Sequence, residues 1–187
     1  LVVDMSHSSE RSSFQAIECS SRPITITHAN PSWWYPARRN KSHELIEALT
    51  DAGGMIGFSL YPHHLKEGSG CSLANFAEMV AMAAERYGVH ALGIGSDLCQ
   101  DQPDSVVEWM RNGRWSIERD FGEGSADQPG FPPQPNWFEG IKDFPNIAVG
   151  LAEVGFSADE IADIMGLNWL RFYEQNFGAS AQGKTTG

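Results

Sequence analysis

The sequence predicts an α/β domain built on a parallel sheet. Short apolar runs alternate with longer stretches of helical periodicity, and four such strand–helix units recur about 20 to 36 residues apart. Each apolar run ends in a polar, titratable side chain, and parallel α/β folds place their chemistry at that end of the strand. The 187 residues, 41% of them hydrophobic, are enough for one packed domain or for part of a larger one.

Four runs are expected to form strands, because they are short, apolar and in part β-branched. They cover residues 1–5, 23–27, 55–60 and 91–96. Amphipathic spacing predicts five helices. They cover residues 9–19, 42–52 with Ser42 as N-cap, 72–87 with Ser72 as N-cap, 136–154 with an interruption near Pro145, and 158 to about 175. Ser157 and Glu160 have the spacing of a capping box for the last helix.

The proline-rich segment 98–136 is long for a simple connection, which predicts a functional loop with short helices, for example around 106–111. The final ten residues, after Phe177, are expected to be a disordered tail. We therefore divide the chain into a domain over 1–177 and a tail over 178–187. The apolar opening at Leu1, without a methionine or a signal peptide, suggests that further sequence precedes it.

Charge and cysteine content limit the possible partners. Thirteen Lys and Arg against 24 Asp and Glu give a formal charge of −11, which argues against binding of nucleic acid or of an anionic membrane surface. No apolar run approaches the roughly 18 residues that a membrane span needs. Three widely spaced cysteines form neither a metal motif nor a disulfide framework, which favours a reducing, cytoplasmic compartment.

The four predicted strands end in His7, His28, Tyr61 and Asp97. Imidazole nitrogens suit a transition metal such as zinc, and an aspartate beside such a site is a candidate general acid or base. Each residue also has a structural interpretation. The histidines can be hydrogen-bonded core residues, Asp97 can cap a turn, and Tyr61 can pack at the rim.

Other polar and aromatic residues carry less information. Arg39 stands in a loop where a solvated surface charge is the ordinary interpretation, and His43, His63, His64 and His90 are expected to be exposed or to act only locally. The cluster from Trp33 to Tyr35 is expected to pack, or to form the wall of a pocket after His28.

Five motifs in order resemble the membrane dipeptidase (renal dipeptidase) family of zinc peptidases, within the amidohydrolase superfamily. They are VDMSH (3–7), PITITHAN (23–30) followed by ARRN (37–40), GGMIGFSLYP (53–62), GIGSD (93–97) and IMGLNWLRFYE (164–174). The resemblance covers nearly the whole chain, but it matches only the C-terminal half of the family's barrel.

The resemblance implies a TIM-like (β/α)8 barrel, of which this chain supplies strands five to eight and the C-terminal helices. It implies a metallo-dipeptidase with two Zn²⁺ ions per complete site. By the same resemblance His7 and His28 are ligands of one zinc ion, Arg39 binds the substrate carboxylate, and Tyr61 lines the site. Asp97 contacts the substrate and handles the protons of the metal-bridging water.

The chain also departs from the family. GSDLCQ stands where the family has GSDFDG, and no counterpart of the family's N-terminal His-x-Asp pair or bridging Glu occurs. We therefore expect this chain alone to be inactive, and to need the N-terminal half of the barrel as upstream sequence or as a second chain. A non-catalytic half-barrel acting in assembly, a homodimer, and another amidohydrolase such as a lactonase remain alternatives. Arg39 favours dipeptides over lactones, because a carboxylate clamp suits a free C-terminus.

Overall fold

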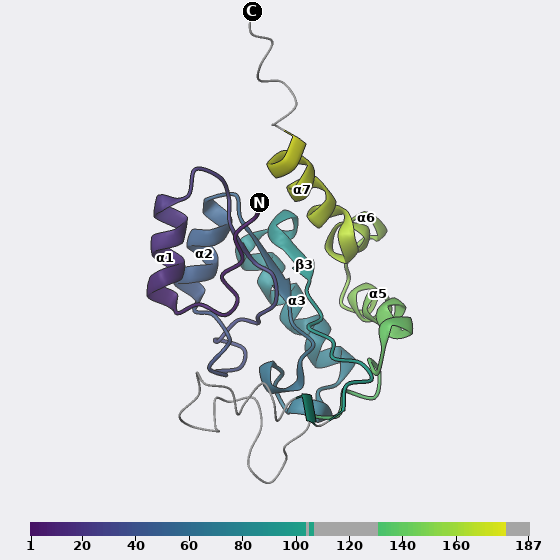
Figure 1. Ribbon diagram of the computed structural model, residues 1–187. Helices are drawn as coiled ribbons and strands as arrows, with labels where there is room; N and C mark the ends of the chain where they lie inside the picture. Colours follow the sequence, from purple (N-terminus) through teal and green to yellow (C-terminus); the bar gives the residue numbers. More distant parts are fainter. Residues whose placement is uncertain (104, 107–130, 179–187) are drawn as a thin grey trace, which may run out of the picture.

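The computed structural model describes residues 1–103, 105–106 and 131–178, and in this part of the chain a small parallel sheet lies among helices (Figure 1). The strand order is β1 (Thr25–Ile26), β2 (Met55–Phe58), β3 (Leu92–Ile94), with β2 in the middle. Both pairs are parallel, and Gly57 of β2 lies opposite Gly93 of β3. The prediction of an α/β fold with a parallel sheet is confirmed.

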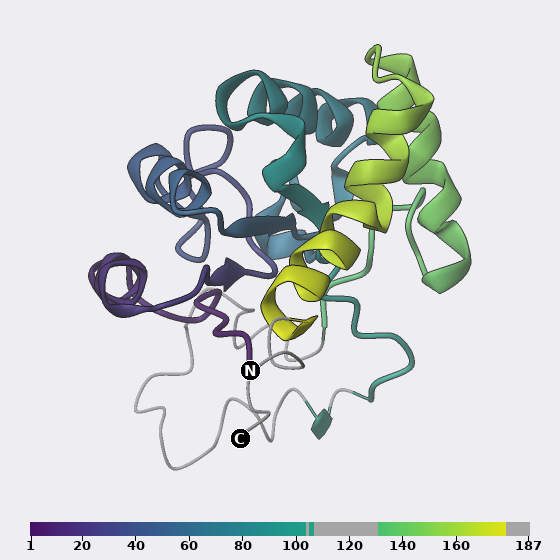
Figure 2. The same ribbon diagram turned by 90° about the horizontal axis from the view of Figure 1, so that it is seen from above.

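The helices form an arc around the strands, which is clearest in the view from above (Figure 2). The helices are α1 (Glu10–Cys19), α2 (His43–Asp51), α3 (Leu73–Tyr87), α5 (Phe144–Glu153), α6 (Ala158–Ala162) and α7 (Asn168–Gly178), and a π-helical turn, η5 (Asp163–Leu167), joins α6 to α7. Short 3₁₀ turns connect other elements: η1 (Pro62–His64), η2 (Gly68–Gly70), η3 (Val89–Ala91) and η4 (Ile141–Asp143).

The predicted first strand, 1–5, is wrong as a strand. Only Asp4 pairs with Thr25, in an isolated parallel bridge, and Leu1 and Val3 are exposed. The ladder stops because the Asp4 carboxylate, rather than a backbone carbonyl, accepts the amide hydrogen of Thr27. The segment therefore lies beside β1, held by two backbone hydrogen bonds to Thr25 and by the Asp4 side chain at Thr27.

Serine caps begin the helices as the sequence predicts. Ser42 and Ser72 accept the amide hydrogens of Leu45 and Asn75, at the first turns of α2 and α3. The expected helix over 136–154 begins only at Phe144, because the proline at 145 is compatible with the first turn and not with the interior of a helix.

The expected single helix over 158–175 consists instead of α6, η5 and α7. Ser157 and Glu160 form the predicted capping box at its start. The backbone then leaves helical geometry at Gly166, and α7 continues from there. Glycine is a poor helix former, so the helix bends at Gly166 rather than at one of the neighbouring residues.

The hydrophobic core lies between the sheet and helices α2, α3 and α5. Strand residues and the apolar faces of these helices are fully buried together. The main contributors are Ile26, Ile56, Phe58, Leu92, Leu45, Leu49, Phe76, Met79, Val80, Ile147 and Leu151. This core fixes the sheet, so the ends of the strands have defined positions.

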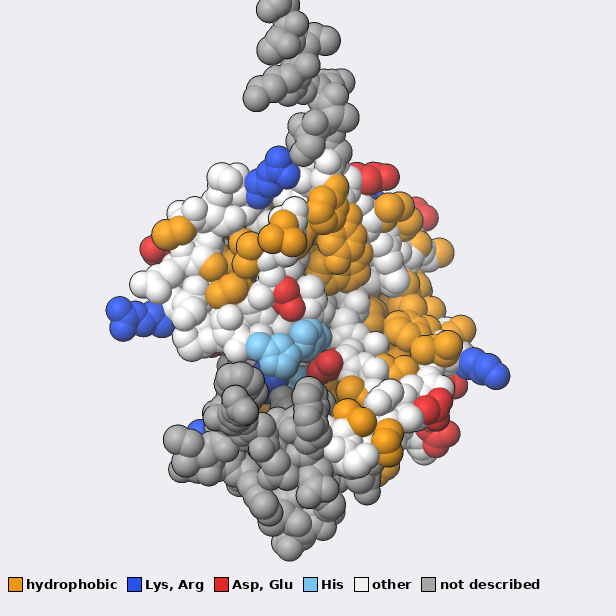
Figure 3. All heavy atoms as spheres, in the orientation of Figure 1, with side chains coloured by type: hydrophobic (Ala, Val, Ile, Leu, Met, Phe, Trp, Pro, Cys, Tyr) orange, Lys and Arg blue, Asp and Glu red, His pale blue; other side chains and the backbone are white. Residues whose placement is uncertain are grey.

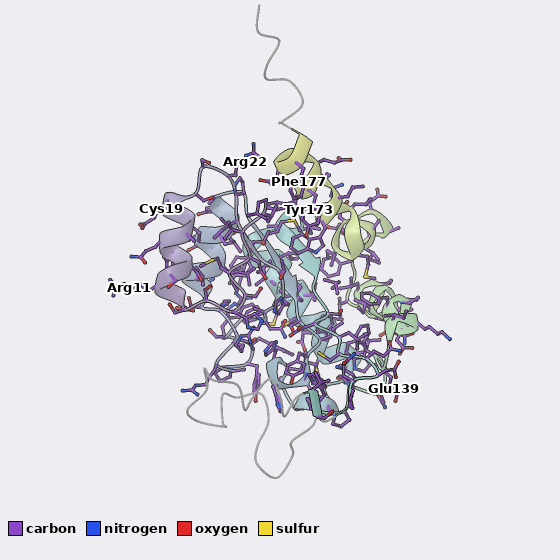
Figure 4. The ribbon with its side chains drawn as sticks, in the orientation of Figure 1. Arg11, Cys19, Arg22, Glu139, Tyr173 and Phe177 are labelled. Atoms are coloured by element: carbon purple, nitrogen blue, oxygen red, sulfur yellow. The ribbon has the colours of Figure 1, made fainter. Side chains whose placement is uncertain are left out.

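Helix α7 is hydrogen-bonded to β3 and the turn before it on one side, and to the turn before β1 on the other. Asn168 donates hydrogen bonds to the carbonyls of Val89 and Leu92, and the Trp169 indole donates to the carbonyl of Ile94. The Arg22 guanidinium, in the turn before β1, donates to the carbonyl of Asn176. Figure 4 shows Arg22 close to the end of α7 that carries the labelled Tyr173 and Phe177.

Parts of the prediction lie outside the described residues: the short helix expected at 106–111 falls mostly on 107–130, and the expected tail on 179–187. Gly178, which the division of the chain assigned to the tail, is the last residue of α7. Of the helices that are described, none combines the length and the apolar character that crossing a bilayer demands.

A buried polar network joins the segments that follow β1 and β2. The amide side chains of Asn30 and Asn40 both donate to the carbonyl of His64, and Asn30 also pairs with the backbone of Ser59 in both directions. The Ser59 hydroxyl lies 2.8 Å from Nδ1 of His64. The expectation that His64 is exposed or merely local is wrong: it is 1% exposed, because η1 turns it back under the loop after β1.

Burial lowers the pKa of His64 to about 3, and the positive charges of Arg39, His28, His63 and His7 act in the same direction. His64 is therefore neutral at physiological pH. A histidine that is buried in neutral form makes the folded state less stable as the pH falls, since the unfolded chain binds a proton that the folded chain excludes.

We predict that Gly57→Ala strongly destabilises the fold. A Cβ atom at position 57 would lie 2.1 Å from the Thr27 carbonyl oxygen, so the strands would have to move apart. The expected cost is about 2 kcal/mol or more of unfolding free energy, measured by urea denaturation. Gly70→Ala is the matched control, because a Cβ there meets nothing closer than 4.0 Å, and its expected change is within about 0.5 kcal/mol. Equal effects of the two variants would contradict the tight strand contact.

We predict that His64→Gln flattens the pH dependence of stability. The stabilising contribution of neutral His64 is complete above its unfolded pKa, near 6.5, and is lost as the pH falls towards 3. In that window the wild type should lose up to about 1.4 kcal/mol per pH unit more than the variant. Urea denaturation of both proteins between pH 7 and pH 4.5 measures the two slopes. Parallel slopes would mean that His64 becomes charged within the fold.

Candidate metal centre and substrate pocket

Four predicted site residues follow the carboxyl end of an element of the sheet. His7 follows the bridge residue Asp4, His28 follows β1, Tyr61 follows β2 and Asp97 follows β3. Because the strands are parallel, these ends share one edge of the sheet. Figure 3 shows histidine side chains gathered in one surface patch, with acidic side chains beside it.

The structure brings His7 and His28 together, as the sequence predicted for their positions. Their Nε2 atoms are 3.0 Å apart, and the ring centroids are 5.0 Å apart with a tilt of 60° between the planes. His7 is exposed and the His28 side chain is 17% exposed, so the pair is open to solvent on one side. Two imidazole nitrogens therefore converge on one accessible point.

Asp4 supports this pair, and the sequence interpretation missed it. Its carboxylate accepts hydrogen bonds from the amide and hydroxyl of Ser6, at 3.0 and 2.6 Å, and from the amide and hydroxyl of Thr27, at 3.0 and 2.8 Å. Partial burial by itself raises the pKa of Asp4, but these four hydrogen bonds outweigh burial and hold the pKa below its usual value. The residue pattern Asp-x-Ser before a strand-end histidine was the available signal.

The two histidines fit a zinc ion in donor type and spacing. Two nitrogen ligands at ordinary Zn–N distances in a tetrahedral site are about 3.3 Å apart, close to the separation of the Nε2 atoms. The other ring nitrogen of His28, Nδ1, lies 2.8 Å from the Thr27 hydroxyl and 4.0 Å from an Asp4 oxygen, an outer-shell arrangement typical of metal-bound histidine. Within 1–103, 105–106 and 131–178, however, no three His, Cys, Asp or Glu side chains form a metal-binding group.

Arg39 and Tyr61 lie in the segments that the buried network ties together. Arg39 is half-buried, and its positive charge lowers the pKa of both Lys41 and His64, although burial is the larger cause for each. Tyr61 is buried, with its ring 5.6 Å from that of His63 and 5.3 Å from that of His64. The predicted substrate residues thus lie close to the neutral His64 and to the positive charge of Lys41.

Asp97 lies three residues after the end of β3, in a segment without regular secondary structure. Its φ of 53° is in the left-handed region, which aspartate tolerates better than most side chains. Two residues earlier, a Cβ at Gly95 would lie 1.7 Å from the Thr27 carbonyl oxygen and 3.3 Å from Cα of His28. Glycine at 95 is therefore what allows the end of β3 to approach His28.

The chain resembles curated dipeptidases over most of its length. It is 23% identical to dipeptidase tcpJ of Claviceps purpurea over 172 residues, which are 91% of this chain and 33% of that protein. It is 25% identical to dipeptidase ataJ of Aspergillus terreus over 176 residues, 93% of this chain and 36% of that one. The chain thus spans about a third of the length of the curated relatives that it matches.

Solved structures share its fold. An amidohydrolase from Pseudomonas aeruginosa superimposes with a TM-score of 0.85 at 25% identity, covering 95% of this chain and 53% of that one. A metallo peptidase from Rhodobacter sphaeroides, liganded with a phosphinate mimic of the dipeptide L-Ala-D-Ala, superimposes with a TM-score of 0.70 at 17% identity, covering 91% and 41%. The second likeness concerns the fold alone.

The family model of membrane dipeptidase, peptidase family M19, matches residues 1–110, which include the segment after Asp4, all three strands and the four strand-end residues. This chain belongs to the membrane dipeptidase family.

Proposed function

We propose that this chain is the C-terminal half of a zinc-dependent dipeptidase barrel, corresponding to strands five to eight and the C-terminal helices. The observation that carries the proposal is the 3.0 Å approach of the His7 and His28 Nε2 atoms at the edge of the sheet where Tyr61 and Asp97 also stand. Family membership supports hydrolysis of dipeptides, and the likeness to a metallo peptidase liganded with a dipeptide mimic supports a metal-dependent reaction.

His7 and His28 would hold one zinc ion. A bound zinc ion supplies Lewis acidity and lowers the pKa of a water molecule, so that the water can attack a peptide carbonyl at neutral pH. The two imidazoles carry no negative charge, and a zinc site normally has three protein ligands. We therefore propose that the remaining ligands, and those of a second zinc ion, come from the N-terminal half of the barrel.

Arg39 and Asp97 have separate tasks in this proposal. The Arg39 guanidinium binds the free carboxylate of the dipeptide, which selects short substrates because the carboxylate must lie close to the scissile bond. Asp97 contacts the substrate amine, accepts the proton of the attacking water and delivers a proton to the leaving amine. Tyr61 lines the pocket between them.

We predict that the 187-residue chain alone lacks dipeptidase activity and gains it with an N-terminal half that carries a His-x-Asp pair and a bridging glutamate. Two imidazoles leave a metal ion mostly bound by water, so a reactive hydroxide is not held in place. The measurement is an assay on L,L and L,D dipeptides with metal content determined in parallel. Robust zinc-dependent hydrolysis by the purified chain, without a partner, would contradict the ligand count.

We predict that Arg39→Ala and Asp97→Asn have opposite kinetic signatures in the completed barrel. Loss of the carboxylate clamp should raise KM about tenfold or more with a smaller change in kcat, and loss of the proton acceptor should lower kcat about 100-fold or more. Steady-state kinetics on one dipeptide separates the two. Arg38→Ala, the exposed neighbour, is the matched control and should leave both constants close to those of the wild type. Normal turnover by Asp97→Asn would contradict the assignment of Asp97 as the proton acceptor.

A further inference from the structure

The hydrogen bonds around Thr27 define which ring nitrogen of His28 carries the proton. The Thr27 hydroxyl has one hydrogen, and it donates this hydrogen to Oδ2 of Asp4 at 2.8 Å. Thr27 Oγ1 also lies 2.8 Å from Nδ1 of His28. Since its hydrogen is already used, Oγ1 can only accept in this second contact, and the hydrogen must come from Nδ1.

Ser6 does not offer an alternative. Its hydroxyl hydrogen goes to Oδ1 of Asp4 at 2.6 Å, and its oxygen accepts the backbone amide hydrogen of His28 at 3.1 Å. The 3.2 Å contact between the Ser6 and Thr27 hydroxyl oxygens therefore has no hydrogen to share. Both hydroxyl hydrogens point to one carboxylate, which as an anion accepts and never donates.

We propose that Asp4 is a positioning residue that acts through Thr27, keeping His28 in the Nδ1–H tautomer so that the lone pair of Nε2 faces His7. A metal binds the unprotonated nitrogen of a neutral imidazole, so this tautomer gives His28 the lone pair that a metal ligand needs at Nε2. The 3.0 Å contact between the two Nε2 atoms holds one hydrogen. In this tautomer Nε2 of His7 donates it and Nε2 of His28 accepts it, whereas in the opposite tautomer the hydrogen would sit on Nε2 of His28 itself. The proposal deepens the proposed function, since it concerns the same pair of histidines.

The same contacts hold the ring in place. The Asp4 carboxylate accepts the Thr27 amide hydrogen at 3.0 Å as well as the hydroxyl hydrogen, so it grips Thr27 at two points. Asp4 is itself bridged to Thr25, two residues before Thr27. The link from Asp4 through Thr27 to His28 is therefore short, and it runs through groups whose backbone is tied to β1.

The first test measures the tautomer of His28 in the metal-free chain. Long-range ¹H–¹⁵N spectra of histidine rings, collected near pH 8, distinguish a protonated from an unprotonated ring nitrogen. We expect Nδ1–H in the wild type, a shift towards Nε2–H in Thr27→Val and Asp4→Asn, and retention of Nδ1–H in Thr27→Ser, which keeps the hydroxyl. Asp51→Asn, an exposed carboxylate at the end of α2, is the control and should not differ from the wild type.

The second test measures Zn²⁺ binding by the same proteins, followed by the ring signals of His7 and His28. Asp4→Asn and Thr27→Val should weaken binding about tenfold or more, and Thr27→Ser should restore it. Backbone spectra identify any variant that fails to fold. Thr27→Val replaces the hydroxyl by a methyl group of similar size, whereas Thr27→Ser keeps the hydroxyl and loses the methyl group, so their comparison decides the result if Asp4→Asn unfolds.

The outcomes separate this inference from the proposed function. Zn²⁺ binding at His7 and His28 together with an unchanged His28 tautomer in Thr27→Val would overturn the positioning role and leave the proposed zinc site intact. The expected tautomers without Zn²⁺ binding, even in the presence of the N-terminal half, would support the positioning of His28 and overturn zinc as the metal of the proposed function. An Nε2–H tautomer in the wild type would overturn the inference directly.

Discussion

Thr27 is the contact point on which the arrangement of the site depends. Its amide and hydroxyl bind Asp4, its hydroxyl also contacts His28, and its carbonyl oxygen lies against Gly57 and Gly95. The two glycines are needed because any side chain there would occupy the space of the carbonyl. Through one residue, the segment carrying His7, the turn carrying His28 and the end of β3 are brought to a common position.

Two polar clusters surround this point, and they differ in charge. The Asp4 cluster stabilises an anion with four donated hydrogen bonds, and the Asn30, Asn40, Ser59 and His64 network contains only neutral groups. Burial and the neighbouring cations keep His64 neutral. Arg39 and Lys41 place positive charge close to this network. This charge suits the proposed binding of a dipeptide carboxylate, although the chain as a whole carries a charge of −11.

The number of metal ligands in this chain is what one would expect of part of a catalytic unit. A pair of imidazoles provides two of the ligands that a catalytic zinc site requires, and the described residues contain no larger metal-binding group. The chain spans about a third of the length of its curated dipeptidase relatives and about half of the amidohydrolase structure that it resembles. The dipeptidase activity proposed here is accordingly a property of the completed barrel.

Local sequence determined the elements that depend on local rules. Serine caps, amphipathic spacing and β-branched runs predicted α1, α2, α3 and the three strands, because capping and periodic burial involve residues a few positions apart. The strand-end positions of His7 and His28 also predicted their convergence, since parallel strands end at the same edge.

Only the tertiary structure decided the features that rest on contacts between distant segments. The segment 1–5 forms a single bridge because the Asp4 carboxylate accepts the amide hydrogen of Thr27, 23 positions away. His64 is buried because Asn30 and Asn40, which belong to another loop, donate hydrogen bonds to its carbonyl. The bend at Gly166 likewise lets Asn168 and Trp169 reach the backbone of β3. Side-chain hydrogen bonds to distant backbone groups leave no periodic trace in a sequence. The sequence pattern therefore predicts a strand at 1–5 and an exposed or local His64, where the folded chain has a single bridge and a buried histidine.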